Sequence, residues 1–493
     1  MVSYKLNKML RPPRSLRHIP HQSYFSLISS LFTKKTFLER SEYFGLPHIN
    51  SKNSNGLYLK PGRFGWELQV TNPAALKQVF LKHDQFPKLS EEEANHNSLF
   101  YKFVGRPNIV LLNGHQWREQ RKIANPAFHR SMPVYLFGKL TQKLFGEIET
   151  LGTTVDVPDL MERWTLDAIG KAGFDFDFNA LGDRNSVWVH TYNTIYSALM
   201  DPMYFFFPIL ESHFMWLLPK RRHAHRELEK FRGMIINIIE EKRRKIESGQ
   251  NQNANLDENE KDLITLMLES EMKGEGKMSN DELEANICVF FLAGHDTTAS
   301  ALSATICYLA LNQDIQQRAR EEAIFILGNE PQDVLPTVED TKKMAYINQI
   351  MKETLRLNGP AATVVSRLAT EDCELAGTFI PKGTVVSPNL YETMHSEKNW
   401  KNALTFDPNR FAADGDGVQV AGKGMNWVPF GNGARQCIGM NFSLAEQRVM
   451  LSMLLRKYTW KLPQDSIHTD GLKAGGLAVV TPMDLKVEFT KLY

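Results

Sequence analysis

A single cysteine near the end of the chain lies among residues that would hold its sulfur for a defined use. Residues 430–439 read FGNGARQCIG, so Cys437 follows two glycines and an arginine and precedes Gly439. Gly431 and Gly433 permit positive φ angles, so the chain there can bulge and aim backbone amides at one atom. A sulfur that receives those amides is held as a thiolate and serves as a ligand. The alternative is a buried structural cysteine after a bulged strand.

The other three cysteines do not suggest zinc or disulfide chemistry. Cys288, Cys307 and Cys373 are far apart in the sequence and follow no CxxC spacing. A zinc ribbon and a disulfide framework are therefore not expected, and a reducing compartment is. Cys288 and Cys307 lie in apolar, helix-type surroundings that are typical of buried core thiols.

Polar residues occupy the centre of a long apolar stretch, residues 279–311. Ser279 and Glu282 form a capping-box pattern that predicts the start of a helix. About thirty residues at ~1.5 Å each give a helix of roughly 45 Å, and its apolar character all round predicts burial. Its centre reads AGHDTT, residues 293–298, and such polar groups are costly there unless they have a purpose. The alternative for Thr297 is a hydroxyl that bonds a carbonyl one turn earlier and bends the helix harmlessly.

Two shorter motifs set a pair of side chains on one helix face. KETLR places Glu353 and Arg356 three residues apart, and WREQR places Trp117 and Arg121 four apart. Read alone, the first pattern predicts a solvated surface ion pair and the second an amphipathic surface helix. FDPNRF supplies Arg410, a third charge that would complete a triangle with the first pair.

Taken together, these motifs resemble the cytochrome P450 family, the haem-thiolate monooxygenases, in its eukaryotic microsomal type. FGNGARQCIG is similar to the family's haem-binding signature, AGHDTT to its oxygen-activation motif and WREQR to its W-x-x-x-R motif. KETLR and FDPNRF resemble its buried Glu-Arg-Arg network, although Asn409 stands where the family usually has glutamate. The matches follow in the family's order from about residue 50 to residue 490.

The resemblance implies that one group of residues binds haem b, with Cys437 as the axial thiolate ligand of its iron. The other residues of this group are the propionate partners Trp117, Arg121, Arg367 and Arg435 and the loop residues Phe430, Gly431 and Gly439. Guanidinium groups suit carboxylate recognition at partly buried sites.

The resemblance also implies the residues that act on oxygen and substrate. Thr297 would hold a water or hydroperoxide, Asp296 would relay protons from solvent, and His295 would be a packed or solvent-linked neighbour, not a ligand. The expected pocket residues are Phe290, Ala293, Gly294, Val364, Val365 and Leu477, with Gly294 leaving room for dioxygen. Glu353, Arg356 and Arg410 would form a structural network that does not tolerate the loss of one member.

The expected fold is mainly α: one large helical domain of the cytochrome P450 fold, with small β-sheets around a buried haem. Residues 49–493 would form this domain, and residues 1–48 a separate basic segment. Strand-like pieces lie in residues 50–85 and 361–400, and residues 476–489 suggest a hairpin-like pair. Successive long helices are expected from residue 221 to residue 330, which contain no proline, with a polar break at 249–260. A further helix is predicted over residues 337–357.

The N-terminal segment leaves two alternatives open. Residues 1–38 of this segment contain seven lysines or arginines and no acidic residue. This composition is typical of a mitochondrial presequence and also of a polybasic segment at a membrane surface. No stretch reaches the roughly 18 apolar residues that a spanning helix needs, so no anchor is expected in the chain as given. RPPRSLRHIP would be the remnant of a proline-rich hinge that follows such an anchor in the family.

The resemblance and the composition also indicate partners. The implied reaction inserts one oxygen atom from O₂ into a lipophilic molecule, such as a steroid, fatty acid or xenobiotic. Because the chain has no flavin, nicotinamide or iron–sulfur signature, electrons would come from an NADPH-cytochrome P450 reductase, with cytochrome b5 as a second donor. The aromatic stretch 197–222 resembles the family's lid, which dips into a membrane surface; core packing is the alternative. A net charge of +2 gives no reason to expect nucleic acid.

The expected location is the cytosolic face of the endoplasmic reticulum, bound peripherally, with the mitochondrion as the alternative, and a monomer is expected. A haem-thiolate isomerase or dehydratase that needs no O₂ competes with this prediction, and the presence of Asp296 and Thr297 argues against it. A non-catalytic haem sensor would need no proton relay and no lid, and would usually carry an output domain. A structural all-α protein with chance matches is excluded by the number and order of the motifs.

Overall fold

The long central helix begins and ends where the sequence predicts. Helix α14 spans Asn280–Leu311. Its start is a complete capping box: Glu282 N donates to Ser279 Oγ at 3.2 Å, and Ser279 N donates to Glu282 Oε2 at 2.8 Å. These two bonds satisfy N–H groups that a helix start otherwise leaves unpaired. The AGHDTT motif is thereby fixed near the middle of a rigid element.

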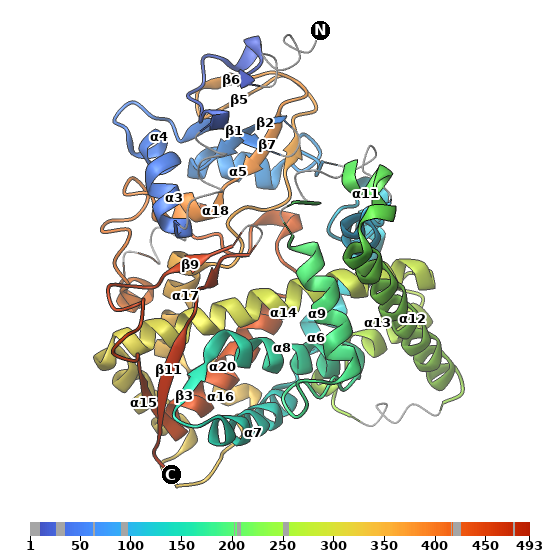
Figure 1. Cartoon of the computed structure of the whole chain (residues 1–493), viewed down its shortest axis with the longest axis vertical. Coiled ribbons are helices and arrows are strands. Elements are labelled where there is room, and N and C mark those ends of the chain that lie inside the picture. Colours follow the sequence, from blue (N-terminus) through green and yellow to red (C-terminus); the bar gives the residue numbers. More distant parts are fainter. Residues whose placement is uncertain are drawn as a thin grey trace. The chain divides into compact units, whose positions relative to one another are not determined.

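A computed structural model describes residues 10–25, 35–62, 65–89, 97–201, 203–204, 209–249, 256–415, 417, 425–476 and 479–493 (Figure 1). The chain divides into two compact units. Unit 1 comprises Met1–Leu89, Gln349–Cys437 and Gly471–Met483, and unit 2 comprises Ser90–Asn348, Ile438–Asp470 and Asp484–Tyr493. The predicted class, mainly helical with small sheets, is confirmed. The predicted boundary between residues 48 and 49 stays a prediction.

Unit 2 holds most of the helices. Its elements are η2 (Tyr101–Gly105), α6 (Gly114–Arg130), α7 (Val134–Leu151), β3 (Thr154–Asp156), α8 (Val157–Phe174), α9 (Val187–Leu199), α11 (Ile209–His213), η3 (Met215–Leu217), α12 (Pro219–Glu247), η5 (Glu258–Glu260), α13 (Leu263–Met272), α14, α15 (Gln313–Leu327), α16 (Val338–Lys343), α20 (Met440–Lys457), β8 (Tyr458–Lys461) and β11 (Lys486–Lys491). Helices α8, α12, α15 and α20 all pack against α14, and α8 runs along it (Figure 1).

Unit 1 is built around a four-stranded sheet. Its elements are η1 (Arg14–Leu16), α3 (Phe37–Phe44), α4 (Leu46–Asn50), β1 (Leu57–Gly62), β2 (Gly65–Val70), α5 (Pro73–Leu81), β4 (Arg367–Leu368), β5 (Cys373–Leu375), β6 (Thr378–Ile380), β7 (Val385–Pro388), α18 (Leu390–His395), η6 (Pro408–Phe411), η7 (Gly433–Arg435), β9 (Ala474–Gly475) and β10 (Thr481–Pro482). Helix α17 (Ala345–Asn358) crosses from unit 2 into unit 1 at Gln349.

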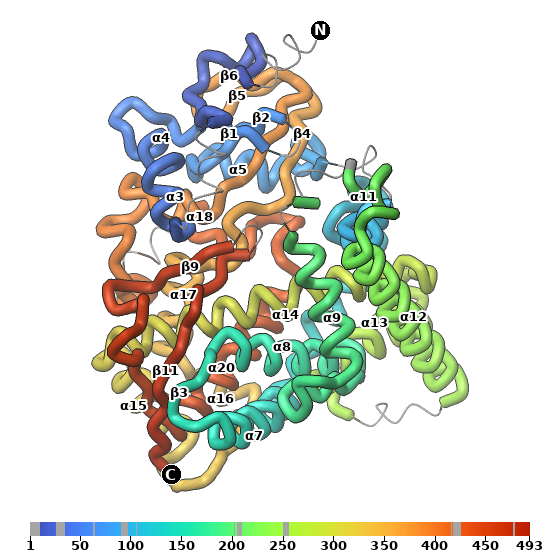
Figure 2. The backbone as a smooth tube through the Cα atoms, viewed as in Figure 1, coloured from blue at the N-terminus to red at the C-terminus, as the bar shows by residue number. Residues whose placement is uncertain are grey.

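The order of the large sheet is β1-β2-β7-β4, which places the early strands β1 and β2, blue in Figure 2, beside strands from residues 367–388, which are orange. β1 and β2 form an antiparallel pair with Leu57 opposite Val70, and β7 joins β2 in parallel. Leu59, Leu68 and other strand residues form an apolar core with α5. Leu16 and Ile19 join that core, so the described part of the basic N-terminal segment packs on unit 1.

The helix predicted over residues 337–357 is instead two helices, α16 and α17, separated at Met344 where ψ is 73°. The backbone N–H groups of Tyr346 and Ile347 donate to the carboxylate of Glu322 at 2.7 and 2.8 Å. Because Glu322 belongs to α15, the cap that starts α17 comes from another helix and leaves no signal in the local sequence.

The predicted hairpin-like pair in residues 476–489 is only partly correct. β10 pairs with β9, whereas β11 pairs with β3 and β8 in a three-stranded sheet. In β11 the apolar residues Val487 and Phe489 are buried while Lys486 is exposed. This alternation gives β11 one apolar face that the core of unit 2 covers. The other predictions, strands within residues 50–85 and 361–400 and helices between residues 221 and 330, are confirmed.

No helix in the described part of the chain is both long and apolar enough to cross a bilayer.

Candidate functional site

The loop of Cys437 has the backbone geometry that its glycines allow. Gly431 and Gly433 have φ angles of 66° and 70°, in the region that favours glycine. A β-carbon at Gly433 would lie 2.8 Å from the carbonyl oxygen of Phe80, which excludes a side chain there. Cys437 N donates to Phe430 O at 2.9 Å and closes the loop. The thiol of Cys437 is exposed and belongs to no disulfide.

Phe430 and Gly439, the first and last residues of the motif, show less clearly why the motif has these residue types. Phe430 is half-buried, and Gly439 is the residue before α20. A β-carbon at Gly439 would lie 3.8 Å from Phe128, which is an ordinary contact. The packing of the described residues therefore leaves room for a side chain at 439, and the predicted need for glycine against a bound group stays a prediction.

Glu353, Arg356 and Arg410 are brought together in a buried network. Arg356 Nε donates to Glu353 Oε2 at 2.7 Å, and Arg356 Nη2 donates to Glu353 Oε1 at 2.9 Å. Arg410 Nε lies 3.3 Å from Glu353 Oε1. The side chains of Glu353 and Arg356 are fully buried, so the pair is no solvated surface ion pair.

Backbone groups complete the network. Arg356 also donates to the carbonyls of Met394, Ala403 and Thr405, at 2.9, 2.6 and 3.2 Å. The backbone N–H of Asp407 donates to Glu353 Oε1 at 3.0 Å. Arg356 thus ties α17 to the end of α18 and to the loop at residues 403–405. Buried charges persist only when they are paired and hydrogen-bonded in this way.

Arg367 is a buried arginine of a different kind. Its side chain is 2% exposed, and its Nε has no hydrogen-bond partner among the described residues. The one hydrogen bond that its guanidinium makes to the described backbone is long, from Nη1 to Phe86 O at 3.4 Å. Burial lowers the pKa of Arg367 to about 10, with no opposing charge to offset it. An anionic group is the partner that this guanidinium fits.

The other expected propionate partners lie on ordered elements. Trp117 and Arg121 are one turn apart in α6, with Trp117 buried and Arg121 half-buried. Arg435 is half-buried at the end of η7, two residues before Cys437.

Helix α14 has one accessible window. Ala293 is the only exposed residue between positions 283 and 310, and Gly294 and Thr297 beside it are half-buried. Thr297 Oγ1 donates to Ala293 O at 2.6 Å, the back-bond to the preceding turn that the sequence left open as an alternative. With its hydrogen used on that carbonyl, the hydroxyl keeps its lone pairs available as acceptors.

Asp296 is buried beside this window. Its side chain is 4% exposed, and burial, followed by the charge of Glu162, raises the pKa of Asp296 to about 8. The hydroxyl of Tyr196 acts in the opposite direction. His295 is also buried, and burial lowers its pKa to about 3. At neutral pH, Asp296 therefore retains a proton for most of the time, while His295 is uncharged.

The structure describes the burial and the contacts of most of the expected pocket residues, but it does not test whether they contact a substrate. Phe290 is buried in an edge-to-face contact with Phe128 at 5.0 Å, and Val364 and Val365 are half-buried. A β-carbon at Gly294 would lie 3.1 Å from the side chain of Ile169 in α8, so glycine at this position allows α8 and α14 to pack closely. The predicted role of Gly294 toward dioxygen stays a prediction, and Leu477 lies outside the described residues.

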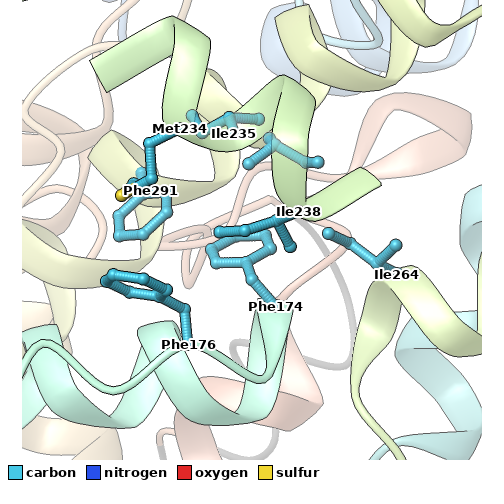
Figure 3. Close-up of a pocket in the computed structure, with 8 residues that line it drawn as sticks. Phe174, Phe176, Met234, Ile235, Ile238, Ile264 and Phe291 are labelled. Atoms are coloured by element: carbon cyan, nitrogen blue, oxygen red, sulfur yellow. The ribbon is translucent and has the colours of Figure 1, made fainter. Parts of the chain in front are cut away.

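A separate apolar pocket lies against the face of α14 that carries Ile287 and Phe291 (Figure 3). It is lined by Phe174, Phe176, Met234, Ile235, Ile238, Ile264, Ile287 and Phe291. At about 100° per residue, Phe291 lies roughly 200° around the helix from Ala293, so this pocket is on the face opposite the window. The space is too narrow for a water molecule. We therefore interpret the pocket as a packing gap where α8, α12, α13 and α14 meet in the core, and not as a substrate site.

Two residues near Asp296 were not predicted from the sequence. Thr165 of α8 contacts His295, and Tyr196 of α9 acts on Asp296. Neither belongs to a motif, and both reach α14 only through tertiary packing. A helical pattern alone cannot indicate which turn of α8 faces which turn of α14.

Comparison with known proteins places the chain in a family. The family model described as "Cytochrome P450" matches residues 68–489. The 11-oxo-beta-amyrin 30-oxidase of Glycyrrhiza uralensis is 30% identical over 82% of this chain and 76% of its own length. Human cytochrome P450 3A5 is 26% identical over 85% of this chain and 82% of its own. The crystal structure of the cytochrome P450DA haem domain covers 90% of each chain, with 22% identity and a TM-score of 0.74.

The fold and the motifs thus define a haem-thiolate protein. The chain belongs to the cytochrome P450 family. It is a monooxygenase, an oxidoreductase that acts on a lipophilic molecule, and its cofactor is haem b with an axial cysteine thiolate. The residues present fit that cofactor: haem b carries propionate carboxylates, and Arg367 is a buried guanidinium without a carboxylate partner among the described residues. The exposed Cys437 thiol supplies a donor of the required kind.

Replacing Glu353 with glutamine is expected to destabilise the protein by about 3–5 kcal/mol in free energy of unfolding, because Arg356 is then left buried without its counter-charge. The measurement is urea unfolding followed by circular dichroism. Glu339→Gln is the matched control, since Glu339 and Lys342 form an ion pair with similar spacing whose side chains are 72% and 64% exposed. The control should cost less than about 1 kcal/mol. Equal costs for the two variants would contradict the structural role of the network.

Proposed function

We propose that the residues of the family motifs perform in this chain the roles that the family gives them. Cys437 supplies the thiolate ligand of the haem iron, in the loop formed by Phe430, Gly431 and Gly439. The proposed propionate partners are Trp117, Arg121, Arg367 and Arg435, and the proposed structural network is Glu353, Arg356 and Arg410. The observation that carries this proposal is the exposed thiol of Cys437 in a loop that contains two positive-φ glycines and is closed by the bond from Cys437 N to Phe430 O.

When bound, the haem supplies the activation of dioxygen and the transfer of one oxygen atom to substrate, while the other atom leaves as water. The chain must then supply protons at the right place. Asp296 is buried and holds a proton at neutral pH, because burial and the charge of Glu162 raise its pKa to about 8. Thr297 is the next residue, and its hydroxyl acceptors are available at the accessible window of α14. We assign proton storage to Asp296 and proton transfer to Thr297.

The substrate is proposed to be a steroid, a fatty acid or a xenobiotic-like lipophile. The apolar character of Phe290, Ala293, Val364 and Val365 supports this class, and Gly294 follows Ala293 on α14. None of these side chains carries a charge that would select a polar substrate.

Electrons are proposed to come from an NADPH-cytochrome P450 reductase, with cytochrome b5 as a second donor, at the cytosolic face of the endoplasmic reticulum. The support is the similarity to eukaryotic relatives such as human cytochrome P450 3A5. A mitochondrial location is the competing proposal, because the N-terminal segment is basic and free of acidic residues before Glu39. A fluorescent reporter fused after residue 60 distinguishes the two by its location in cells, and a mitochondrial signal overturns the first proposal.

The segment after α11 is proposed to touch the membrane surface. Phe214, Trp216 and Leu217 are 43%, 68% and 55% exposed, and the exposed Lys220 and Arg222 follow them. Exposed aromatic residues beside basic residues suit the boundary between lipid headgroups and acyl chains. Core packing, the alternative from the sequence, does not account for side chains that are this accessible.

The double substitution Trp216→Ser and Leu217→Ser is expected to weaken binding to vesicles of mixed neutral and anionic phospholipid by about tenfold, because apolar area is lost from the contact. Flotation with the vesicles measures it. Phe325→Ser is the control, since Phe325 is 90% exposed on α15, away from this segment in sequence. An equal loss in the control would contradict a specific contact.

Replacing Thr297 with valine is expected to lower the fraction of reducing equivalents that reaches product by about tenfold or more, with hydrogen peroxide released instead. The proton pathway loses its hydroxyl while the shape of the side chain is kept. The measurement compares NADPH consumed, product formed and peroxide released, with a lipophile that shifts the haem spin state.

Thr305→Val is the matched control for this variant. Thr305 Oγ1 also donates to the carbonyl one turn earlier, Ala301 O, at 2.8 Å, but Thr305 is buried away from the window. If the two variants lose coupling equally, the back-bond alone accounts for the effect, and the proposed proton transfer is wrong. Turnover of substrate without O₂ consumption would favour the isomerase alternative.

A further inference from the structure

The surroundings of His295 favour one position for its ring hydrogen. Nδ1 of His295 is 3.0 Å from Thr165 Oγ1, and both side chains are buried. The same hydroxyl is 2.9 Å from the carbonyl oxygen of Met161 and 3.2 Å from that of Glu162. A hydroxyl has one hydrogen, and carbonyl oxygens have none to give. We assign the hydrogen of Thr165 to the nearer carbonyl, so that the hydrogen between Thr165 and His295 comes from Nδ1.

A neutral imidazole carries one hydrogen, so Nε2 of His295 is left with a lone pair. Burial, which lowers the pKa of His295 to about 3, keeps the ring neutral at physiological pH. Nε2 lies 3.6 Å from Asp296 Oδ1, slightly beyond hydrogen-bond range. The other carboxyl oxygen, Oδ2, has no hydrogen-bond partner among the described residues.

An ionised Asp296 would thus set a negative carboxylate oxygen against the lone pair of a neutral ring. A carboxyl proton on Asp296 removes that repulsion, and a small closure of the 3.6 Å gap makes it a hydrogen bond to Nε2. The arrangement favours a stored proton on the residue just before Thr297.

We propose that Thr165 and His295 are positioning residues for Asp296: Thr165 fixes His295 as the Nδ1–H tautomer, and the Nε2 lone pair then keeps a proton on the Asp296 carboxyl group. The inference deepens the proposed function and rests on its assignment of Asp296 as the proton store. It gives Thr165, a residue of α8 outside every recognised motif, an influence on a group that it does not touch.

The other groups that face Asp296 act in both directions. Glu162 of α8 raises the pKa of Asp296 through its charge, and the hydroxyl of Tyr196 of α9 lowers it. Tyr192 of α9 makes an edge-to-face contact with the His295 ring at 5.4 Å, and burial, followed by the charge of Asp296, raises the pKa of its hydroxyl. No cation among the described residues opposes the raised pKa of Asp296, in agreement with a proton held there.

The test replaces Thr165 with valine, which has nearly the same shape and no acceptor, and compares it with Thr165→Ser, which keeps the hydroxyl. In the valine variant the Nδ1–H tautomer loses its partner, so the hydrogen is expected to move to Nε2 and donate to Asp296. That bond stabilises the ionised carboxylate. The pKa of Asp296 should then fall by about one unit or more, although the substitution is on another helix.

Two readouts that need no turnover measure this in the holoenzyme. Side-chain ¹⁵N spectra of ¹⁵N-histidine-labelled protein report the tautomer, with the signal of His295 identified by its loss in His295→Gln. Infrared difference spectra across pH report the protonated carboxyl band of Asp296, identified by its loss in Asp296→Asn. The wild-type chain and Thr165→Ser should show the Nδ1–H tautomer and the higher carboxyl pKa, and Thr165→Val should show the other tautomer and the lower pKa.

An Nε2–H tautomer in the wild-type chain would overturn the inference, and so would an unchanged carboxyl pKa in Thr165→Val. Both results are independent of the proposed function, whose own failure appears as unimpaired coupling in Asp296→Asn and Thr297→Val. A fall in the carboxyl pKa with Thr165→Val that Thr165→Ser does not share supports the inference, because a general packing defect has no reason to follow the loss of the hydroxyl.

Discussion

The burial of α14 is the constraint on which the rest of unit 2 depends. A helix that is covered on nearly all sides cannot leave its polar side chains to water, so each one requires a partner on a neighbouring helix or a shifted pKa. Thr298 meets Ser443 of α20 at 3.0 Å, and His295 meets Thr165 of α8 at 3.0 Å. Asp296 is the case of the shifted pKa, because no cation among the described residues matches its carboxyl group, which keeps its proton at neutral pH. Burying the polar groups of the AGHDTT motif therefore costs free energy. Among the described residues, no charged partner near Asp296 offsets that cost, and Asp296 is the residue to which the proton storage is assigned.

Arg356 and Arg367, both buried in unit 1, show the same principle with opposite outcomes. Arg356 has its full set of acceptors within the chain, from Glu353 and three carbonyls, and is complete by itself. Arg367 is as deeply buried but has only a long bond to Phe86 O, so its charge calls for an anion that the described residues do not provide. A structural arginine thus differs from a cofactor-binding arginine in that residues of the chain supply acceptors for all of its N–H groups.

The parts of the fold that follow from short-range patterns could be predicted from the sequence. The capping box at Ser279 marks the start of α14 because both of its hydrogen bonds join residues three apart. The spacing of Glu353 and Arg356 likewise predicts their shared face. The break at Met344 could not be predicted, since Glu322 of a different helix caps α17. The role of Thr165 could not be predicted for the same reason. It depends on which turn of α8 contacts α14, and only tertiary packing determines that contact.

The ligation of the haem iron by the Cys437 thiolate is tested by the absorption difference spectrum of the reduced protein with and without carbon monoxide. The comparison uses the wild-type chain, Cys437→Ser and Cys373→Ser, the last being a half-buried cysteine outside the loop. We expect the strongly red-shifted Soret band of a thiolate-ligated haem in the wild-type chain and in Cys373→Ser, and its loss in Cys437→Ser. A band that survives in Cys437→Ser, or a wild-type band at the position of a histidine-ligated haem, would contradict this ligation.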